Sequence, residues 1–222
     1  MYREAIGQFI TDKSAKLYVP KNSGLNEYVQ DILQSIGVSE VGEFKRPGKD
    51  YGQLEIRSVR GEDVPQRVDD CLQRGEVAYG LTGDDLFDEY LLATPQSPLR
   101  LLNTYDWFDP SAQFNRPALC LLNRSGELPA SAITVSVAVN KKYELTSKRY
   151  LAHMMGTLGG SYSVVSYAGD TEYTVSEGTH DWCIEVVYRG AKSANSATSE
   201  TGLQVADIVR FSDISLIGLE AQ

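Results

Sequence analysis

Three short polar loops have the composition of places that hold a ligand. They are Lys21–Gly24, Gly80–Asp85 and Gly190–Ser196, and each lies at the end of a segment that reads as a β-strand. In open α/β sheets, ligands bind beyond the carboxyl ends of the strands, where such loops offer N–H and side-chain donors. None of the three contains the GxxxxGK[ST] pattern of a Walker A loop. They indicate a site for a phosphorylated small molecule, although each by itself is also typical of an ordinary strand-to-helix turn.

Other chemistries find little support in the residue types. The chain has only two histidines, His153 and His180, so neither a zinc site nor a Ser-His-Asp triad is expected, and no GxSxG sequence is present. The three cysteines, Cys71, Cys120 and Cys183, are odd in number and have no CxxC spacing. They are typical of reduced thiols in a cytoplasmic protein.

Composition excludes two classes of partner. The 222 residues carry a formal net charge of -9, which argues against nucleic-acid binding because that requires a basic surface. The N-terminal residues lack the apolar stretch of a signal peptide, and no run of about 20 apolar residues could span a membrane. We therefore expect a cytoplasmic protein that binds neither nucleic acid nor membrane.

Strands and helices alternate through the first half of the sequence. Patterning predicts strands at 16–20, 53–60 and 77–82, and helices at 25–36, 64–74 and from a Gly83-Asp84-Asp85 cap to about Tyr90. This order favours an α/β fold with mostly parallel sheets and helices on both faces.

The proline-rich segment 95–117 is the least regular stretch of the sequence, and we place the crossover into a second lobe within it. Strands are expected at 118–122, 133–138, 162–167, 182–187 and 214–219, with a helix at 146–155 capped by Thr146, a flexible loop at 191–201 and a short helix or strand at 203–209. We expect the first lobe to comprise residues 1–105 plus 191–222, and the second to comprise 106–190.

Several segments, taken in order, resemble one enzyme family. VRGEDVPQRVDDCLQRGEVAYGLTGDDL (59–86) is similar to the VRxxDIPxxVxxGxxDLGITGxDxL stretch of the ATP phosphoribosyltransferases, and this is the most specific match. Shorter similarities are VPKNSGL (19–25) to LPKGRL, ELTSKRYLA (144–152) to NLTxRYFA, VVSYAGDTE (164–172) to IVxLSGSxE, HDWCIEVVYRGAKS (180–193) to ADAIVDIVSTGTTL and ETGL (200–203) to ENGL. The resemblance is collinear and covers most of the chain.

The resemblance implies a two-lobed fold like the type II periplasmic binding proteins, with the active site between the lobes. It also implies a reaction, in which ATP and phosphoribosyl pyrophosphate, with Mg²⁺, give phosphoribosyl-ATP and pyrophosphate. N1 of the adenine would attack C1 of the ribose as pyrophosphate leaves. Catalysis of that kind depends on positioning and on neutralising charge, and it needs no covalent nucleophile.

Two acidic residues are assigned to this site by the resemblance. Asp181 and Glu185 correspond to the two acidic residues of the family's DAIVD, of which the second would accept hydrogen bonds from the ribose hydroxyls. Glutamate in place of aspartate keeps the charge and lengthens the side chain. A strand with one solvent-facing carboxylate explains the same pattern.

The phosphate loop departs most from the family. Where the family has STGTTL, this chain has Tyr188-Arg189-Gly190-Ala191-Lys192-Ser193, and only Gly190 matches. Arg189, Gly190, Lys192 and Ser193 are the candidates for binding the 5′-phosphate, with charge replacing the threonine hydroxyls. Arg189 and Lys192 could equally be solvated.

Lys21 and Arg60 are the other candidate substrate-binding residues. They match the lysine of LPKGR and the arginine of VRxxDIP, although each alone is typical of a surface charge.

These comparisons lead to two functional hypotheses. The first is a short-form ATP phosphoribosyltransferase catalytic chain that forms a homo-oligomer and works with a regulatory subunit resembling histidyl-tRNA synthetase. The second is a diverged, non-catalytic or differently specific ligand-binding protein on the same fold, which the altered loop favours.

Overall fold

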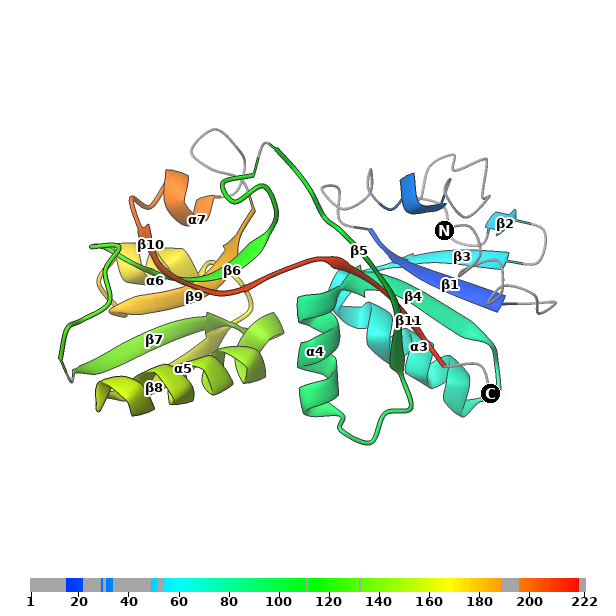
Figure 1. Cartoon of the computed structure of the whole chain (residues 1–222), viewed down its shortest axis with the longest axis horizontal. Coiled ribbons are helices and arrows are strands. Elements are labelled where there is room, and N and C mark those ends of the chain that lie inside the picture. The colour runs from blue at the N-terminus through cyan, green and yellow to red at the C-terminus, as the bar shows by residue number, and fades with distance from the viewer. Residues whose placement is uncertain are drawn as a thin grey trace. The chain divides into compact units, whose positions relative to one another are not determined.

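The computed structural model describes residues 15–21, 29, 31–33, 49–51, 54–110, 112–131, 133–188 and 196–219. They form two compact units, unit 1 within Met1–Asp106 and Asp213–Gln222, and unit 2 within Trp107–Ser212. Each unit is one β-sheet flanked by helices (Figure 1), so the two-lobed α/β prediction is confirmed. In this described part of the chain, no helix is both long enough and apolar enough to cross a membrane.

Unit 1 contains a six-stranded mixed sheet. The strand order is β2 (Lys49–Tyr51), β3 (Leu54–Val59), β1 (Ala15–Pro20), β4 (Ala78–Gly83), β11 (Ile214–Gly218) and β5 (Arg100–Tyr105). Strand β1 pairs in parallel with β3 and β4, whereas β2, β5 and β11 pair antiparallel with their neighbours. The carboxyl ends of the three parallel strands therefore lie at one edge of this sheet.

Helix α3 (Val64–Gln73) packs closely against β4. It follows the short 3-10 helix η1 (Gly61–Asp63), begins with a proline in its first turn, and buries Val64, Val68 and Cys71 at helical spacing. A Cβ on Gly80 of β4 would lie 2.6 Å from a methyl of Val64 and 2.9 Å from one of Val68. Glycine at this position is what allows the helix and the strand to approach.

Helix α4 (Asp84–Ala93) directly follows β4. We expected Asp84 to cap this helix, and the structure gives Gly83 as its N-cap residue. The backbone N–H of Asp84 donates to the carbonyl of Asp213, and its carboxylate accepts from the N–H of Asp213. Asp84 therefore anchors the segment that re-enters unit 1 just before β11.

Unit 2 contains a five-stranded mixed sheet. The strand order is β10 (Gln204–Phe211), β6 (Ala118–Asn123), β9 (Trp182–Val187), β7 (Thr134–Asn140) and β8 (Ser161–Tyr167). Strand β7 is parallel to β8 and β9, whereas β6 is antiparallel to β9 and β10.

Helices cover both faces of the unit 2 sheet. In Figure 1, α5 (Glu144–Leu158) lies on one side, and α6 (Thr171–Ser176) and α7 (Ser196–Ser199) lie on the other. A 3-10 helix, η2 (Lys141–Tyr143), leads from β7 into α5. Val175 of α6 packs with the buried Cys120, Cys183 and Val187 of the sheet. All three cysteines of the chain are free and buried.

The expectation of mostly parallel sheets was only partly right. Parallel pairing occurs where helices connect the strands, as in β7-α5-β8-α6-β9, because a parallel neighbour requires a long crossover. Strands β10 and β11 belong to a returning segment with only a two-residue gap between them, and each adds antiparallel to a sheet. Both sheets are therefore mixed.

Residues 196–212 do not belong to the first lobe, to which we assigned 191–222. Strand β10 pairs with β6 along Gln204–Phe211, which holds this segment in unit 2, and the chain enters unit 1 only at Asp213. Residues 191–195 lie outside the described part of the chain. The sequence pattern of 204–211 alone did not reveal which sheet would accept the strand.

Two local predictions were also wrong, and one helix was missed. Strand β5 lies within the proline-rich segment 95–117, which we expected to be irregular. Helix α5 begins at Glu144, so Thr146 is inside the helix and does not cap it. Helix α6 was not predicted at all. Of the helix predicted at 25–36, only residues 29 and 31–33 are described, and they are helical.

Candidate functional site

Glu185 lies near the carboxyl ends of the parallel strands of unit 2. The β7–β9 register pairs Val139 with Ile184, which makes Asn140 and Glu185 neighbours. The carboxylate Oε2 of Glu185 accepts hydrogen bonds from Asn140 Nδ2 and from Thr171 Oγ1, both at 2.9 Å. Two neighbouring parallel strands, β7 and β9, and the first residue of α6 thus contribute to one cluster, which we call the Glu185 cluster (Asn140, Thr171 and Glu185).

Burial gives this carboxylate an unusual protonation behaviour. The pKa of Glu185 is raised above its ordinary value of 4.5, chiefly because burial removes water, and the nearby charge of Glu172 adds to the effect. Hydrogen bonds from Asn140, Thr171 and the Val186 N–H oppose the shift. In the described residues, no lysine or arginine pairs with Glu185. Its partners in the described part of the chain are neutral donors.

Asp181 lies at the other end of β9 and does not join the cluster. Its Oδ2 accepts from the backbone N–H and the hydroxyl of Ser136, both at 2.8 Å. These two hydrogen bonds lower the pKa of Asp181 below its ordinary value. At about 3.3 Å per residue along a strand, Asp181 and Glu185 are separated by about 13 Å. The structure therefore assigns Asp181 a role in joining β9 to β7.

Tyr188 marks the start of the divergent loop. Its ring packs against Trp107, with the ring centroids 5.4 Å apart and the planes tilted by 57°. This contact holds the first residue of the loop within unit 2. The remaining predicted phosphate-binding residues, Arg189, Gly190, Lys192 and Ser193, lie outside the described residues.

Unit 1 presents two cations at neighbouring strand ends. The β1–β3 register ends with Pro20 opposite Val59, so Lys21 and Arg60 follow side by side, and the Lys21 N–H donates to the Val59 carbonyl at 2.8 Å. Both side chains are exposed. Neither makes an ion pair with another described residue. The structure thus brings Lys21 and Arg60 together, as a site for an anion requires.

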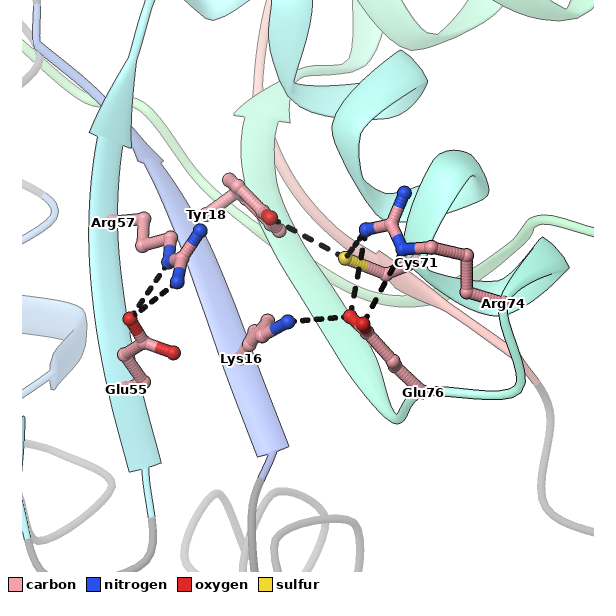
Figure 2. Close-up of polar contacts among 7 residues, drawn as sticks. All are labelled: Lys16, Tyr18, Glu55, Arg57, Cys71, Arg74 and Glu76. Atoms are coloured by element: carbon pink, nitrogen blue, oxygen red, sulfur yellow. Dashed lines mark hydrogen bonds and ion pairs between the residues drawn. The ribbon is translucent and has the colours of Figure 1, made fainter. Parts of the chain in front are cut away.

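A second polar cluster in unit 1 lies toward the amino ends of the same strands. Figure 2 shows Glu76 between Lys16 of β1 and Arg74, with which it forms ion pairs. Arg74 also donates to the thiol of Cys71, which contacts the hydroxyl of Tyr18 at 3.3 Å. We call these residues the Glu76 network. This network joins α3 to β1. It lies toward the amino ends of the strands, whereas ligands bind at the carboxyl ends, so it is not a candidate site.

A resident metal centre is not visible among the groups described. In those parts of the chain, no cluster of three or more histidine, cysteine, aspartate or glutamate side chains could hold an ion. The Glu185 cluster supplies one carboxylate, an amide and a hydroxyl.

No protein-family model matches the chain, and no curated protein matches it. Among solved structures, it is similar to the ATP phosphoribosyl transferase (HisG:HisZ) complex from Thermotoga maritima. The identity is 19%, the match covers 92% of this chain and 87% of that chain, and the TM-score is 0.60. It is also similar to the alkanesulfonate-binding protein SsuA from Xanthomonas axonopodis pv. citri, bound to MOPS. That identity is 13%, the coverage is 94% of this chain and 66% of that chain, and the TM-score is 0.50.

These similarities show a shared fold. The chain has the two-domain α/β architecture of periplasmic-binding-protein-like structures, which confirms the predicted fold class. One of the two similar structures is an enzyme and the other is a binding protein. Because one fold hosts many functions, the function must be argued from the side chains.

Sequence reasoning missed Asn140 and Thr171, which position the key carboxylate. A signal for both was present, because each lies just after a predicted strand, where parallel strands place ligand-binding groups. Thr171 even falls within the quoted segment VVSYAGDTE. Their contact with Glu185 depends on the pairing of β7 with β9, which the linear sequence does not state.

Proposed function

We propose that this chain is an ATP phosphoribosyltransferase catalytic chain, which transfers the phosphoribosyl group of phosphoribosyl pyrophosphate to N1 of ATP. The observation that carries the proposal is the Glu185 cluster. No cation of the described residues pairs with this carboxylate. Its Oε2 accepts from Asn140 and Thr171 and its Oε1 accepts from the Val186 N–H, so Oε1 can still accept a hydrogen bond from a ribose hydroxyl. The collinear sequence motifs and the shared fold support the same assignment.

The proposed reaction makes modest demands on the protein. The adenine N1 forms a bond to C1 of the ribose, and the bond from C1 to the pyrophosphate oxygen breaks, so that positive charge develops at C1. Glu185 would orient the ribose. Lys21 and Arg60 would balance the charge of substrate phosphates, and Mg²⁺ would enter with phosphoribosyl pyrophosphate as part of that substrate. Orientation and charge stabilisation of this kind can supply much of the rate acceleration.

A second candidate function is ligand binding without catalysis. Two observations favour it, namely that Asp181 is engaged by Ser136 and that the ring of Tyr188 is engaged by Trp107. Both residues occupy positions where the family resemblance assigns groups to the active site. The resemblance also leads us to propose a homo-oligomer and a regulatory subunit resembling histidyl-tRNA synthetase. Static light scattering, with and without that subunit, tests the assembly.

Calorimetry and turnover distinguish the two functions. The wild-type chain should bind phosphoribosyl pyrophosphate in the presence of Mg²⁺ and release pyrophosphate when ATP is added. Glu185→Gln should weaken that binding roughly 10–150-fold, as expected for a lost hydrogen bond to a charged group, and should abolish turnover.

Asp181→Asn on the same strand is the matched control and should retain turnover. Wild-type binding of phosphoribosyl pyrophosphate without pyrophosphate release in the complete assembly would select the second function. Failure of the wild type to bind phosphoribosyl pyrophosphate would rule out the enzyme.

A further inference from the structure

A second candidate site lies within unit 2, on the α5 side of its sheet. A pocket of about 520 Å³ opens between α5 and β10. Arg149, Tyr150 and His153 line it from the helix, and Val209, Arg210 and Phe211 line it from the strand. Its volume is within the range of about 300–1,000 Å³ that small-molecule sites occupy.

Irregular pairing of β10 turns polar side chains toward this pocket. Between Ile208 and Arg210 the β10–β6 register shifts, so that Arg210 pairs with Leu119. Asp207 and Arg210 are three residues apart, so regular alternation would have put them on opposite faces of the sheet. However, Asp207 pairs with Leu121 and Arg210 pairs with Leu119, and these two leucines lie on the same face of β6. The bulge thus places Arg210 on the same face as Asp207. Bulges commonly re-aim a side chain in this way beside functional sites.

Helix α5 supplies the opposite wall with a stripe of polar residues. Arg149, Tyr150 and His153 are spaced so that they lie along one side of the helix. The hydroxyl of Tyr150 donates to Asp207 at 2.6 Å, which ties the helix to β10 next to the pocket. The exposed Arg149 makes no hydrogen bond or ion pair with any other described residue. One guanidinium in the pocket wall is therefore available to a ligand.

The pocket combines positive charge with an apolar surface. Arg149 and Arg210 provide two planar guanidinium groups, and Val209 provides the apolar part. Phe211 also borders the pocket, but it pairs with Ala118 on the face opposite to Arg210, where its ring packs against Phe114. Arg210 Nε points to the carbonyl of Phe211 at 3.4 Å, which orients its side chain along the strand. The concentration of cations is notable in a chain whose net charge is -9. Guanidinium groups bind phosphate and carboxylate through paired hydrogen bonds.

We propose that this pocket binds a small organic phosphate whose phosphate contacts Arg149 and Arg210 and whose apolar part rests against Val209. The site is separate from the Glu185 cluster. Cys183 and Val187, which flank Glu185 on its face of β9, pack with Val175 of α6, whereas α5 lies on the other side of the sheet (Figure 1). A ligand here would be an addition to the substrates proposed for Glu185.

Titration calorimetry with phenyl phosphate tests the proposal. The wild-type chain should bind phenyl phosphate more tightly than inorganic phosphate, because only the former has an apolar part. Arg149→Met and Arg210→Met should each weaken binding of phenyl phosphate roughly 10–150-fold. Arg149 is exposed, so its replacement should leave the fold intact, and circular dichroism would verify this.

Lys148→Met is the matched control because Lys148 is an exposed cation on the same helix and does not line the pocket. It should leave the affinity unchanged, as should Glu185→Gln, which separates this site from the proposed catalytic one. The proposal is overturned if the wild type does not bind phenyl phosphate. It is also overturned if Arg149→Met has no effect, or if Lys148→Met weakens binding as much as Arg149→Met does.

Discussion

The carboxylates of Glu185 in unit 2 and Glu76 in unit 1 have different hydrogen-bonding partners, and their pKa values shift in opposite directions. Glu76 lies between Lys16 and Arg74, and these partners lower its pKa to about 2. Glu185 is held by an amide and a hydroxyl, and burial raises its pKa. The first residue lies near the amino ends of parallel strands, and the second lies near the carboxyl ends of another set.

This contrast separates a structural carboxylate from a candidate functional one. In the Glu76 network the carboxylate is paired with two cations, so it needs no ligand to neutralise it. In the Glu185 cluster the carboxylate is partly buried and no cation among the described residues pairs with it, an arrangement that favours protonation or a ligand with donor hydroxyls. We therefore expect changes around Glu185 to alter binding and changes around Glu76 to alter only stability.

The largest stability effect is expected from Thr171→Val. This change removes the hydrogen bond to the Glu185 carboxylate while keeping the side-chain volume, and such bonds to charged groups contribute about 1.5–3 kcal/mol. Thr82→Val is the matched control in unit 1. Thr82 is equally buried, but its hydroxyl donates to the neutral carbonyl of Gly61, a bond expected to contribute about 0.5–1.5 kcal/mol. Urea denaturation would measure the free energy of unfolding of both variants, and equal losses of that free energy would contradict the special role of Glu185.

The two carboxylates should also give stability profiles of opposite slope with pH. For Glu76, whose pKa is lowered from 4.5 to about 2, the stabilising contribution is present above pH 4.5 and is lost as the pH falls toward 2. For Glu185, whose pKa is raised, the contribution is complete below pH 4.5 and is lost as the pH rises through the raised value.

Melting temperatures across this pH range, compared with those of Glu76→Gln and Glu185→Gln, would measure each contribution separately. The advantage of the wild type over Glu76→Gln should shrink toward low pH, and its advantage over Glu185→Gln should shrink toward neutral pH. The same slope for both variants would refute the distinction drawn between the two sites.

The smallest effect is expected from Tyr18→Phe. The hydroxyl of Tyr18 contacts the thiol of Cys71 at 3.3 Å, and sulfur is a weak hydrogen-bonding partner. We therefore expect a loss of less than about 1 kcal/mol in urea denaturation, with no change in ligand binding. A loss as large as that of Thr171→Val would indicate that the network contributes more than its ion pairs suggest.

Much of the fold could be predicted from local patterns. The alternation of 54–59 and the helical spacing of Val64, Val68 and Cys71 identified β3 and α3, and Gly75, with a φ of +74°, supports the predicted stop after that helix. Strand β5 was missed because its residues are half-buried or exposed at a sheet edge, so they lack a strong apolar pattern.

Only part of the candidate site could be predicted from the sequence. Glu185 was identified through its motif, and Lys21 and Arg60 were identified as cations that follow strands. Asp181, which we predicted together with Glu185, lies about 13 Å from it along the strand. Its contact with Ser136 arises from the pairing of β9 with β7.

The sequence by itself determined the class of the fold, the main strands and helices, and the residue types able to hold an anion. These follow from hydrophobic periodicity, glycine and proline positions and the inventory of charged groups, all of which are local. Only the tertiary structure decided which sheet receives β10, which donors surround Glu185, and which face of the sheet Arg210 occupies. The pairing of β10 with β6 joins residues 81 to 93 positions apart, and the contact of Asn140 with Glu185 joins residues 45 positions apart. Both depend on strand register, which is set by the packing of the whole sheet.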